Sequence, residues 1–191
     1  MTLVCVTKEA AVPQMEEALE AGAVMFGENR VQDAAAKHKA IGDKAAWHLI
    51  GHLQTNKAKD AVKIFTLIHS VDSLHLAQEI DKQAGKIGKV QDILIQVNTS
   101  GEESKFGISP EGAVGLVKDA GSLKNLSIKG LMTIAPEVGD AETVRPYFAA
   151  LRKLRDSINP AWHLSMGMTN DFEVAIEEGS TMVRLGRIIF R

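Results

Sequence analysis

Lys8 is the first residue whose type and position could support covalent chemistry. It follows a short run rich in apolar and β-branched residues, Thr2–Thr7, which predicts a β-strand. An amine at the end of a buried strand is partly desolvated, and a second cation such as Arg184 nearby would favour its uncharged form. An uncharged lysine amine attacks carbonyl groups and forms a Schiff base. We therefore expect Lys8 to hold a carbonyl compound.

A second group of residues, near the C-terminus, has the composition of a phosphate site. Ser165 offers a hydroxyl, and Gly167 lets the backbone approach a ligand closely. Gly186 and Arg187 offer backbone N–H groups to an anion. Arg184 lies two residues before this turn, where its charge would disfavour protonation of a pyridine nitrogen. An aldehyde-binding lysine together with a phosphate cup is what pyridoxal 5'-phosphate (PLP) requires, so we predict PLP as cofactor.

Eight short apolar runs, each followed by polar or glycine-rich residues, predict the elements that position this chemistry. The predicted strands are Thr2–Thr7, Ala23–Phe26, Trp47–Ile50, Ile64–His69, Ile93–Val97, Lys129–Ile134, Ala161–Ser165 and Met182–Leu185. Amphipathic stretches between them predict helices over Pro13–Ala21, Val31–Ile41, Asn56–Val62, Ser73–Ala84 and Ala141–Ile158, with another beginning at Ser109. Strands that alternate with helices indicate a parallel sheet.

Eight such strands are the number that closes a (β/α)8 TIM barrel, the α/β fold that we expect. An open doubly wound sheet is the alternative, but it calls for a glycine-rich fingerprint after the first strand, and Lys8–Ala11 is not one. Barrel active sites lie at the C-terminal ends of the strands, which would gather the polar residues at one mouth. We expect a single domain over residues 1–191, apparently without a helix before the first strand or after the last.

Composition excludes several classes of function. The net charge of −2 indicates neither a nucleic acid nor an anionic membrane as partner. The one cysteine, Cys5, cannot form a disulfide within the chain, and the histidines lack the paired spacing of metal ligands. No apolar run approaches the ~18 residues of a membrane span, and the N-terminus lacks the features of a signal peptide. These observations predict a cytoplasmic protein without a metal.

The candidate residues lie in long motifs that resemble a known family. The motifs are TLVCVTK, FGENRVQD, WHLIGHLQTNKAK, VNTSGEESKFGI, GLMTIAP and LSMGMTNDFEVAIEEGSTMVRLGR. Together they resemble the YggS/PROSC family of pyridoxal phosphate homeostasis proteins, and the resemblance spans the whole chain. Members of this family resemble the N-terminal barrel of alanine racemase and lack its second, β-rich domain.

The resemblance implies which residues bind PLP. Lys8 matches the lysine that forms the Schiff base, and Asn29 matches an asparagine close to the cofactor. Arg184 matches the arginine at the pyridine nitrogen. Ser165 matches the phosphate-binding serine, and Gly186 with the residue after it matches the rest of the phosphate cup.

Two departures from the family pattern concern the cofactor site and the N-terminus. The residue after Gly186 is often threonine in the family and is Arg187 here, which leaves open whether its backbone or its side chain contacts the phosphate. Family members generally have a helix before the strand that carries the lysine, whereas Lys8 comes almost at once in this chain.

Three functions are compatible with these residues. The first is a PLP carrier that stores, delivers or buffers the cofactor without turnover, with apo-PLP enzymes as transient clients, working as a monomer or weak homodimer. The second is an amino-acid racemase, which needs acid/base groups on both faces of the substrate. Alanine racemases supply the second group as a tyrosine from the other domain, and the single tyrosine here, Tyr147, lies in an apolar helix stripe. The third is a PLP-free aldolase that uses Lys8 directly.

The remaining basic residues are expected to have mostly structural roles. The run Lys37-His38-Lys39 is predicted to be a solvated helix face, and Lys105 a surface lysine rather than a ligand of PLP or of a second phosphate. His48 and His163 are predicted to be core or rim histidines, which leaves His52 as the better candidate for a pocket role.

Overall fold

Each of the eight apolar runs forms a strand, in the predicted order. In the computed structural model, which describes residues 1–190, the strands are β1 (Thr2–Val6), β2 (Met25–Glu28), β3 (Ala46–Leu49), β4 (Leu67–Val71), β5 (Gln91–Gln96), β6 (Leu126–Met132), β7 (His163–Ser165) and β8 (Met182–Leu185). Each strand pairs in parallel with the next, and β8 pairs with β1. The sheet is therefore a closed barrel, which confirms the (β/α)8 prediction and excludes the open sheet.

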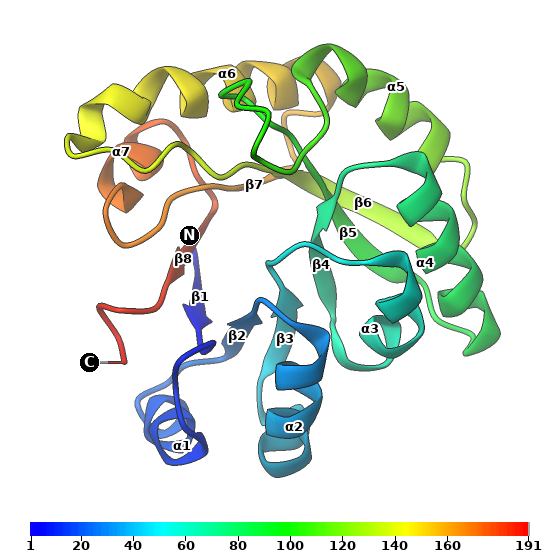
Figure 1. Ribbon diagram of the computed structural model, residues 1–191, viewed down its shortest axis with the longest axis vertical. Coiled ribbons are helices and arrows are strands. Elements are labelled where there is room, and N and C mark those ends of the chain that lie inside the picture. The colour runs from blue at the N-terminus through cyan, green and yellow to red at the C-terminus, as the bar shows by residue number, and fades with distance from the viewer. Residues whose placement is uncertain (191) are drawn as a thin grey trace.

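Helices follow seven of the strands and lie outside the ring of strands (Figure 1). They are α1 (Val12–Glu20), α2 (Val31–Ile41), α3 (Ala58–Ile64), α4 (Leu74–Lys86), α5 (Pro110–Ala120), α6 (Arg145–Ile158) and α7 (Phe172–Glu177), with short 3-10 turns at Gly42–Lys44, Thr55–Lys57 and Ala141–Val144. Ser73 and Ser109 cap α4 and α5, since each hydroxyl accepts a backbone N–H at 3.3 Å. None of the described helices is long and apolar enough to cross a membrane.

Only the last strand has the predicted bounds at both ends, and the other seven differ by one to three residues at one or both ends. Two of these differences have a clear physical reason. The fourth strand is Leu67–Val71 rather than Ile64–His69, because Ile64 completes α3 and apolar periodicity cannot divide a short run between a helix end and a strand. The second strand extends through Glu28, which the sequence suggests is part of a turn. A buried carboxylate inside a strand is unexpected from sequence alone, because the partner that neutralises it comes from a later element.

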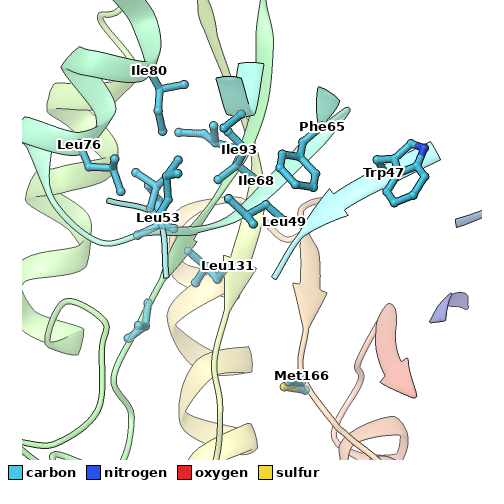
Figure 2. Close-up of a cluster of buried hydrophobic side chains, with 14 of the residues drawn as sticks. Trp47, Leu49, Leu53, Phe65, Ile68, Leu76, Ile80, Ile93, Leu131 and Met166 are labelled. Carbon is cyan, nitrogen blue, oxygen red and sulfur yellow. The ribbon is translucent and has the colours of Figure 1, made fainter. Parts of the chain in front are cut away.

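The main hydrophobic core lies between the barrel and its helices. Its largest fully buried side chains include Trp47, Phe26 and Phe65. Figure 2 shows part of this core, in which Leu76 and Ile80 of α4 lie close to Ile68 and Ile93 on the strands. Helix packing against the barrel therefore accounts for most of the buried apolar surface.

A smaller apolar cluster lies inside the barrel, formed by Leu67, Leu94, Met132 and Met182. Parallel strands place register partners on the same face of a sheet. Leu67 is the register partner of His48, and Ser165 is the partner of both Met132 and Met182. His48 and Ser165 therefore also point into the barrel, as do His69 and Arg184, which lie two residues further along the strands of Leu67 and Met182.

Gly51 permits a close approach between the segments that follow β2 and β3. A Cβ at Gly51 would lie 2.8 Å from Asn29 Cα and 2.9 Å from Asn29 C, which is closer than side chains tolerate. We expect Gly51→Ala to displace Asn29 and to lower the free energy of unfolding by about 1–3 kcal/mol through overpacking. The measurement is chemical denaturation of the two proteins.

Gly115→Ala is the matched control, because Gly115 lies exposed within α5 and an added Cβ would meet nothing within 4 Å. Alanine in a helix is more stable than glycine, so this substitution should raise the free energy of unfolding by roughly 0.5–1 kcal/mol. Equal effects of the two substitutions would contradict the steric explanation.

Candidate functional site

A cavity of about 470 Å³ opens at the C-terminal ends of the strands. Its lining includes five of the six residues predicted to bind PLP: Lys8, Asn29, Arg184, Gly186 and Arg187. These residues follow or end β1, β2 and β8, and the pairing of β1 with both other strands brings them together. The cavity thus lies where barrel folds carry their active sites.

Lys8 lies at the rim of this cavity. Its side chain is 49% exposed, and its Nζ lies 3.6 Å from Glu9 Oε1. An exposed ion pair of this length contributes little to stability and leaves the amine free to move. The amine can therefore reach both the cavity and the solvent.

The backbone just before Lys8 is held by a buried network. The fully buried Glu28 carboxylate accepts a hydrogen bond of 2.6 Å from Thr7 Oγ1. It also forms an ion pair with Lys37, whose Nζ lies 2.7 Å from Glu28 Oε1. The same Lys37 Nζ donates to the Thr7 carbonyl. The prediction that Lys37 is a solvated residue is therefore wrong. Burying either Glu28 or Lys37 without the other would be costly, so the two residues must stay together. Because both also bind Thr7, the ion pair holds the end of β1 against β2 and α2.

Arg184 is the buried cation of the site. It is only 4% exposed, and its guanidinium donates from Nη1 to Ser165 Oγ at 2.7 Å and from Nη2 to the Thr133 carbonyl at 2.9 Å. It forms no salt bridge within residues 1–190. Burial lowers the pKa of Arg184 to about 10, and the nearby Asp171 partly opposes this shift.

Ser165 lies deeper in the barrel than the predicted phosphate contact requires. Its hydroxyl has no exposed surface, does not line the cavity, and is shared between Arg184 Nη1 and His69 Nδ1. These two hydrogen bonds hold the hydroxyl inside the barrel, and the phosphate contact of Ser165 stays a prediction. The hydroxyl is part of the polar interior of the barrel.

Among the described residues, Thr169 is the one hydroxyl-bearing residue that lines the cavity. Its neighbour Asn170 and the turn residues Gly186 and Arg187 also line the cavity. The chain turns toward the cavity at Gly167, whose φ of +95° favours glycine and where a Cβ would lie 2.6 Å from Ala175 Cβ. A hydroxyl two residues after such a glycine is a signal that sequence reasoning could have used.

The backbone of Gly186 lies close to the first strand, and a side chain there would contact Val6. A Cβ at this position would lie 3.1 Å from the Val6 carbonyl oxygen and 3.2 Å from Val6 Cβ. The side chain of the next residue, Arg187, adds a positive charge to the lining. The turn can thus present both backbone and side-chain donors to an anion.

Two further predictions about single residues are corrected by the structure. Lys105 is not simply a surface lysine, because it lines the cavity and its Nζ donates to the Ala135 carbonyl at 2.9 Å. His52 does not line the cavity. Its ring instead stacks on Phe106, with ring centroids 3.9 Å apart, and its Nδ1 lies 3.8 Å from Asp72.

The other histidines divide between the barrel interior and the surface. His48 is buried, as predicted, and its Nδ1 lies 3.1 Å from His69 Nε2. His163 is exposed at the start of β7. No cluster of three potential metal ligands occurs in the described part of the chain.

The sequence of the chain is similar to those of a known group of proteins. The family described as the N-terminal domain of alanine racemase matches residues 2–191. The pyridoxal phosphate homeostasis protein of Aquifex aeolicus is 48% identical over 182 residues, which is 92% of this chain and 80% of the relative. The protein of the same name from Synechocystis is 40% identical, over 98% of this chain and 89% of the relative.

The chain belongs to the pyridoxal phosphate homeostasis protein family. This is the YggS/PROSC family that the motifs indicate. Among solved structures, PipY of Synechococcus elongatus with PLP bound superposes with a TM-score of 0.93 and 36% identity, covering 100% of this chain and 92% of PipY. An alanine racemase of Clostridium difficile superposes with a TM-score of 0.77 at 16% identity, over 99% of this chain and 52% of the racemase, which shows the shared fold alone.

Burial of the two interior histidines predicts acid-sensitive stability. Burial, and secondarily His163, lowers the pKa of His48 from 6.5 to about 4, and burial with His48 and Arg184 holds the pKa of His69 well below its usual range. The unfolded chain binds protons at these rings that the folded protein does not. Stability is therefore retained above pH 6.5 and lost as the pH falls toward 4.

We expect His48 alone to contribute roughly 3 kcal/mol to this acid destabilisation. Thermal melts across the pH range should show a shallower decline below pH 6.5 for His48→Gln than for the native protein. His75→Gln removes an exposed histidine of α4 and should leave the decline unchanged. A His48→Gln profile parallel to the native one would refute the assignment.

Proposed function

We propose that this protein binds PLP at the barrel mouth through Lys8 and serves in PLP homeostasis by storing, delivering or buffering the cofactor. The observation that carries the proposal is that one cavity is lined by a reachable amine, Lys8, and by a buried guanidinium, Arg184, that has no salt-bridge partner within residues 1–190. Bound PLP would supply an aldehyde for the amine and a pyridine nitrogen and phosphate for recognition.

The buried end of the cavity suits a neutral acceptor. Arg184 has five N–H donors, and two of its nitrogens already donate to Ser165 and the Thr133 carbonyl. An Arg184 N–H that remains free to donate toward the cavity fits an unprotonated pyridine nitrogen, which is an acceptor. A protonated pyridine nitrogen would place a second positive charge beside the guanidinium. The residues present therefore fit the cofactor, with Arg184 holding the ring nitrogen in its unprotonated form.

The opposite end of the cofactor is assigned to the Thr169 and Gly186-Arg187 segments. The Thr169 hydroxyl, the backbone of Gly186 and the charge of Arg187 line the cavity together. Hydrogen-bond donors of this kind bind phosphate, and charged donors bind it more strongly than neutral ones. We propose that Thr169 replaces Ser165 as the hydroxyl that contacts the phosphate.

The family context supports the same reading. The relatives from Aquifex aeolicus and Synechocystis are named pyridoxal phosphate homeostasis proteins, and the PipY structure holds PLP. We propose apo-PLP enzymes as transient clients, the cytoplasm as the location and a monomer or weak homodimer as the working form.

The lining of the cavity favours a carrier over a racemase. Within residues 1–190, no tyrosine or histidine is among the lining side chains. Tyr147 lies in α6 and is packed against the hydrophobic core. Lys105 is a second amine at the mouth, but the Ala135 carbonyl holds its Nζ. The tyrosine that alanine racemases place opposite the lysine thus has no counterpart among the lining side chains of residues 1–190, so we propose that the protein binds PLP without turnover.

The attachment residue can be identified by chemical trapping. Purified protein incubated with PLP should turn yellow, and borohydride should fix the cofactor to Lys8, as peptide mass would show. Lys8→Ala should lose the label, whereas Lys105→Ala, which removes the other amine lining the cavity, should keep it. A colourless native protein, or a label that persists in Lys8→Ala, would overturn the proposal.

Turnover distinguishes the three functions. The PLP-loaded protein incubated with L-alanine and other amino acids should leave their chirality unchanged, because no tyrosine or histidine of residues 1–190 lines the cavity to act on the face opposite Lys8. Chiral chromatography over time provides the measurement. Racemisation at enzyme-like rates would establish the racemase, and borohydride trapping of a sugar phosphate on PLP-free protein would establish the aldolase.

A further inference from the structure

Three polar side chains inside the barrel have no part in the proposed function, yet they join Arg184 in one hydrogen-bonded chain. Arg184 Nη1 lies 2.7 Å from Ser165 Oγ, which lies 2.9 Å from His69 Nδ1. His69 Nε2 in turn lies 3.1 Å from His48 Nδ1. We call Arg184, Ser165, His69 and His48 the interior chain. All four residues are at most 4% exposed, so water cannot easily replace any of these bonds.

The chemistry of arginine fixes the direction of every bond in the interior chain. A guanidinium can only donate, so Ser165 Oγ accepts from Arg184. The hydroxyl proton is then free to point at His69 Nδ1, which must accept it. His69 therefore carries its proton on Nε2 and donates to His48 Nδ1, which leaves the proton of His48 on Nε2.

The opposite direction would leave a buried donor unpaired. If His69 Nδ1 donated to Ser165, the serine oxygen would accept two hydrogen bonds and its own proton would need a third partner. Within residues 1–190, Ser165 Oγ has only Arg184 and His69 as side-chain or backbone partners. An unsatisfied buried hydroxyl costs about 1–3 kcal/mol, which favours the first direction.

The charge state of the rings agrees with this direction. Burial holds the pKa of His69 well below its usual range and lowers that of His48 to about 4, so both rings are neutral at physiological pH. The other groups near them are also cationic or potentially cationic, namely Arg184 and His163. A neutral ring provides the one acceptor and one donor that the interior chain needs at His69, and the acceptor that it needs at His48.

We infer that the interior chain is a positioning device for Arg184, in which His48 and His69, each protonated on Nε2, hold Ser165 as an acceptor for Nη1. Rotation of the guanidinium is then limited by Ser165 on one side and the Thr133 carbonyl on the other. The remaining donors stay directed at the cavity. This role toward the cofactor rests on the proposed function, whereas the direction of the bonds does not.

The direction of the bonds can be measured without any cofactor. Nitrogen-15 NMR of the histidine rings in the PLP-free protein at neutral pH distinguishes protonated from unprotonated ring nitrogens. We expect both His48 and His69 to be neutral and protonated on Nε2. A proton on Nδ1 of His69, or a charged ring at either position, would overturn the inference.

The positioning role is tested by breaking the interior chain at two places. His69→Phe removes the acceptor for Ser165, and Ser165→Ala removes the acceptor for Arg184. Each should weaken PLP binding by about tenfold, the effect of roughly one hydrogen bond, and should shift the visible absorption maximum of the bound cofactor. His69→Asn, which can return an acceptor to Ser165, should recover part of the affinity and the native absorption maximum.

Ser180→Ala is the matched control. Ser180 is also buried, and its hydroxyl lies within hydrogen-bond distance of the carbonyl oxygens of Leu164, Met166 and Met182, not of Arg184. It should lower the melting temperature without changing PLP affinity or absorption. Unchanged affinity and absorption in both interior-chain variants would overturn the positioning role. A native protein that binds no PLP would overturn the proposed function, while the NMR result would still decide the direction of the bonds.

Discussion

The burial of the Arg184 guanidinium inside the barrel is the interaction on which the arrangement of the site depends. Removing such a charge from water costs several kcal/mol even after relaxation, and a carboxylate partner is the usual compensation. Here the compensation comes from the Ser165 hydroxyl and the Thr133 carbonyl, with Asp171 near enough to oppose the fall in pKa. A cation kept under these conditions, in a cavity, is typical of a binding site rather than of a stabilising ion pair.

Barrel closure turns this buried charge into part of a site. Val4 of β1 is the register partner of Arg184 on β8. Lys8 comes four residues after Val4, and it therefore lies nearer the mouth of the barrel than Arg184 does. The depth of Arg184 and the exposure of Lys8 are therefore linked by the strand pairing. The apolar cluster of Leu67, Leu94, Met132 and Met182 occupies the same interior.

The features that could be predicted from the sequence are those that a short stretch of neighbouring residues determines. Each strand coincides with or overlaps a short apolar run, and Lys8 and Gly186 follow directly on such runs, so their place at the mouth could be predicted. The roles of Ser165 and Lys37 could not, because their partners are distant in sequence or lie in a strand that ends later than expected. Ser165 meets His69 across 96 residues, and Lys37 pairs with Glu28, which the sequence suggests is in a turn. Burial of a polar side chain depends on such partners, and spacing along one chain does not reveal them.

The two ends of the cavity differ in their exposure to solvent, and this difference favours storage of a cofactor over catalysis. At the deep end Arg184 is buried and donates to Ser165 of β7 and to the carbonyl of Thr133, the residue directly after β6. The mouth is open at Lys8, whose side chain is about half exposed beside Glu9. Specific catalysis on a covalently held cofactor requires that water and competing amines be kept away from the reacting carbon. A site that fixes the ring firmly but leaves its covalent link accessible would retain the cofactor until another amine reaches it, which is the behaviour that storage and delivery require.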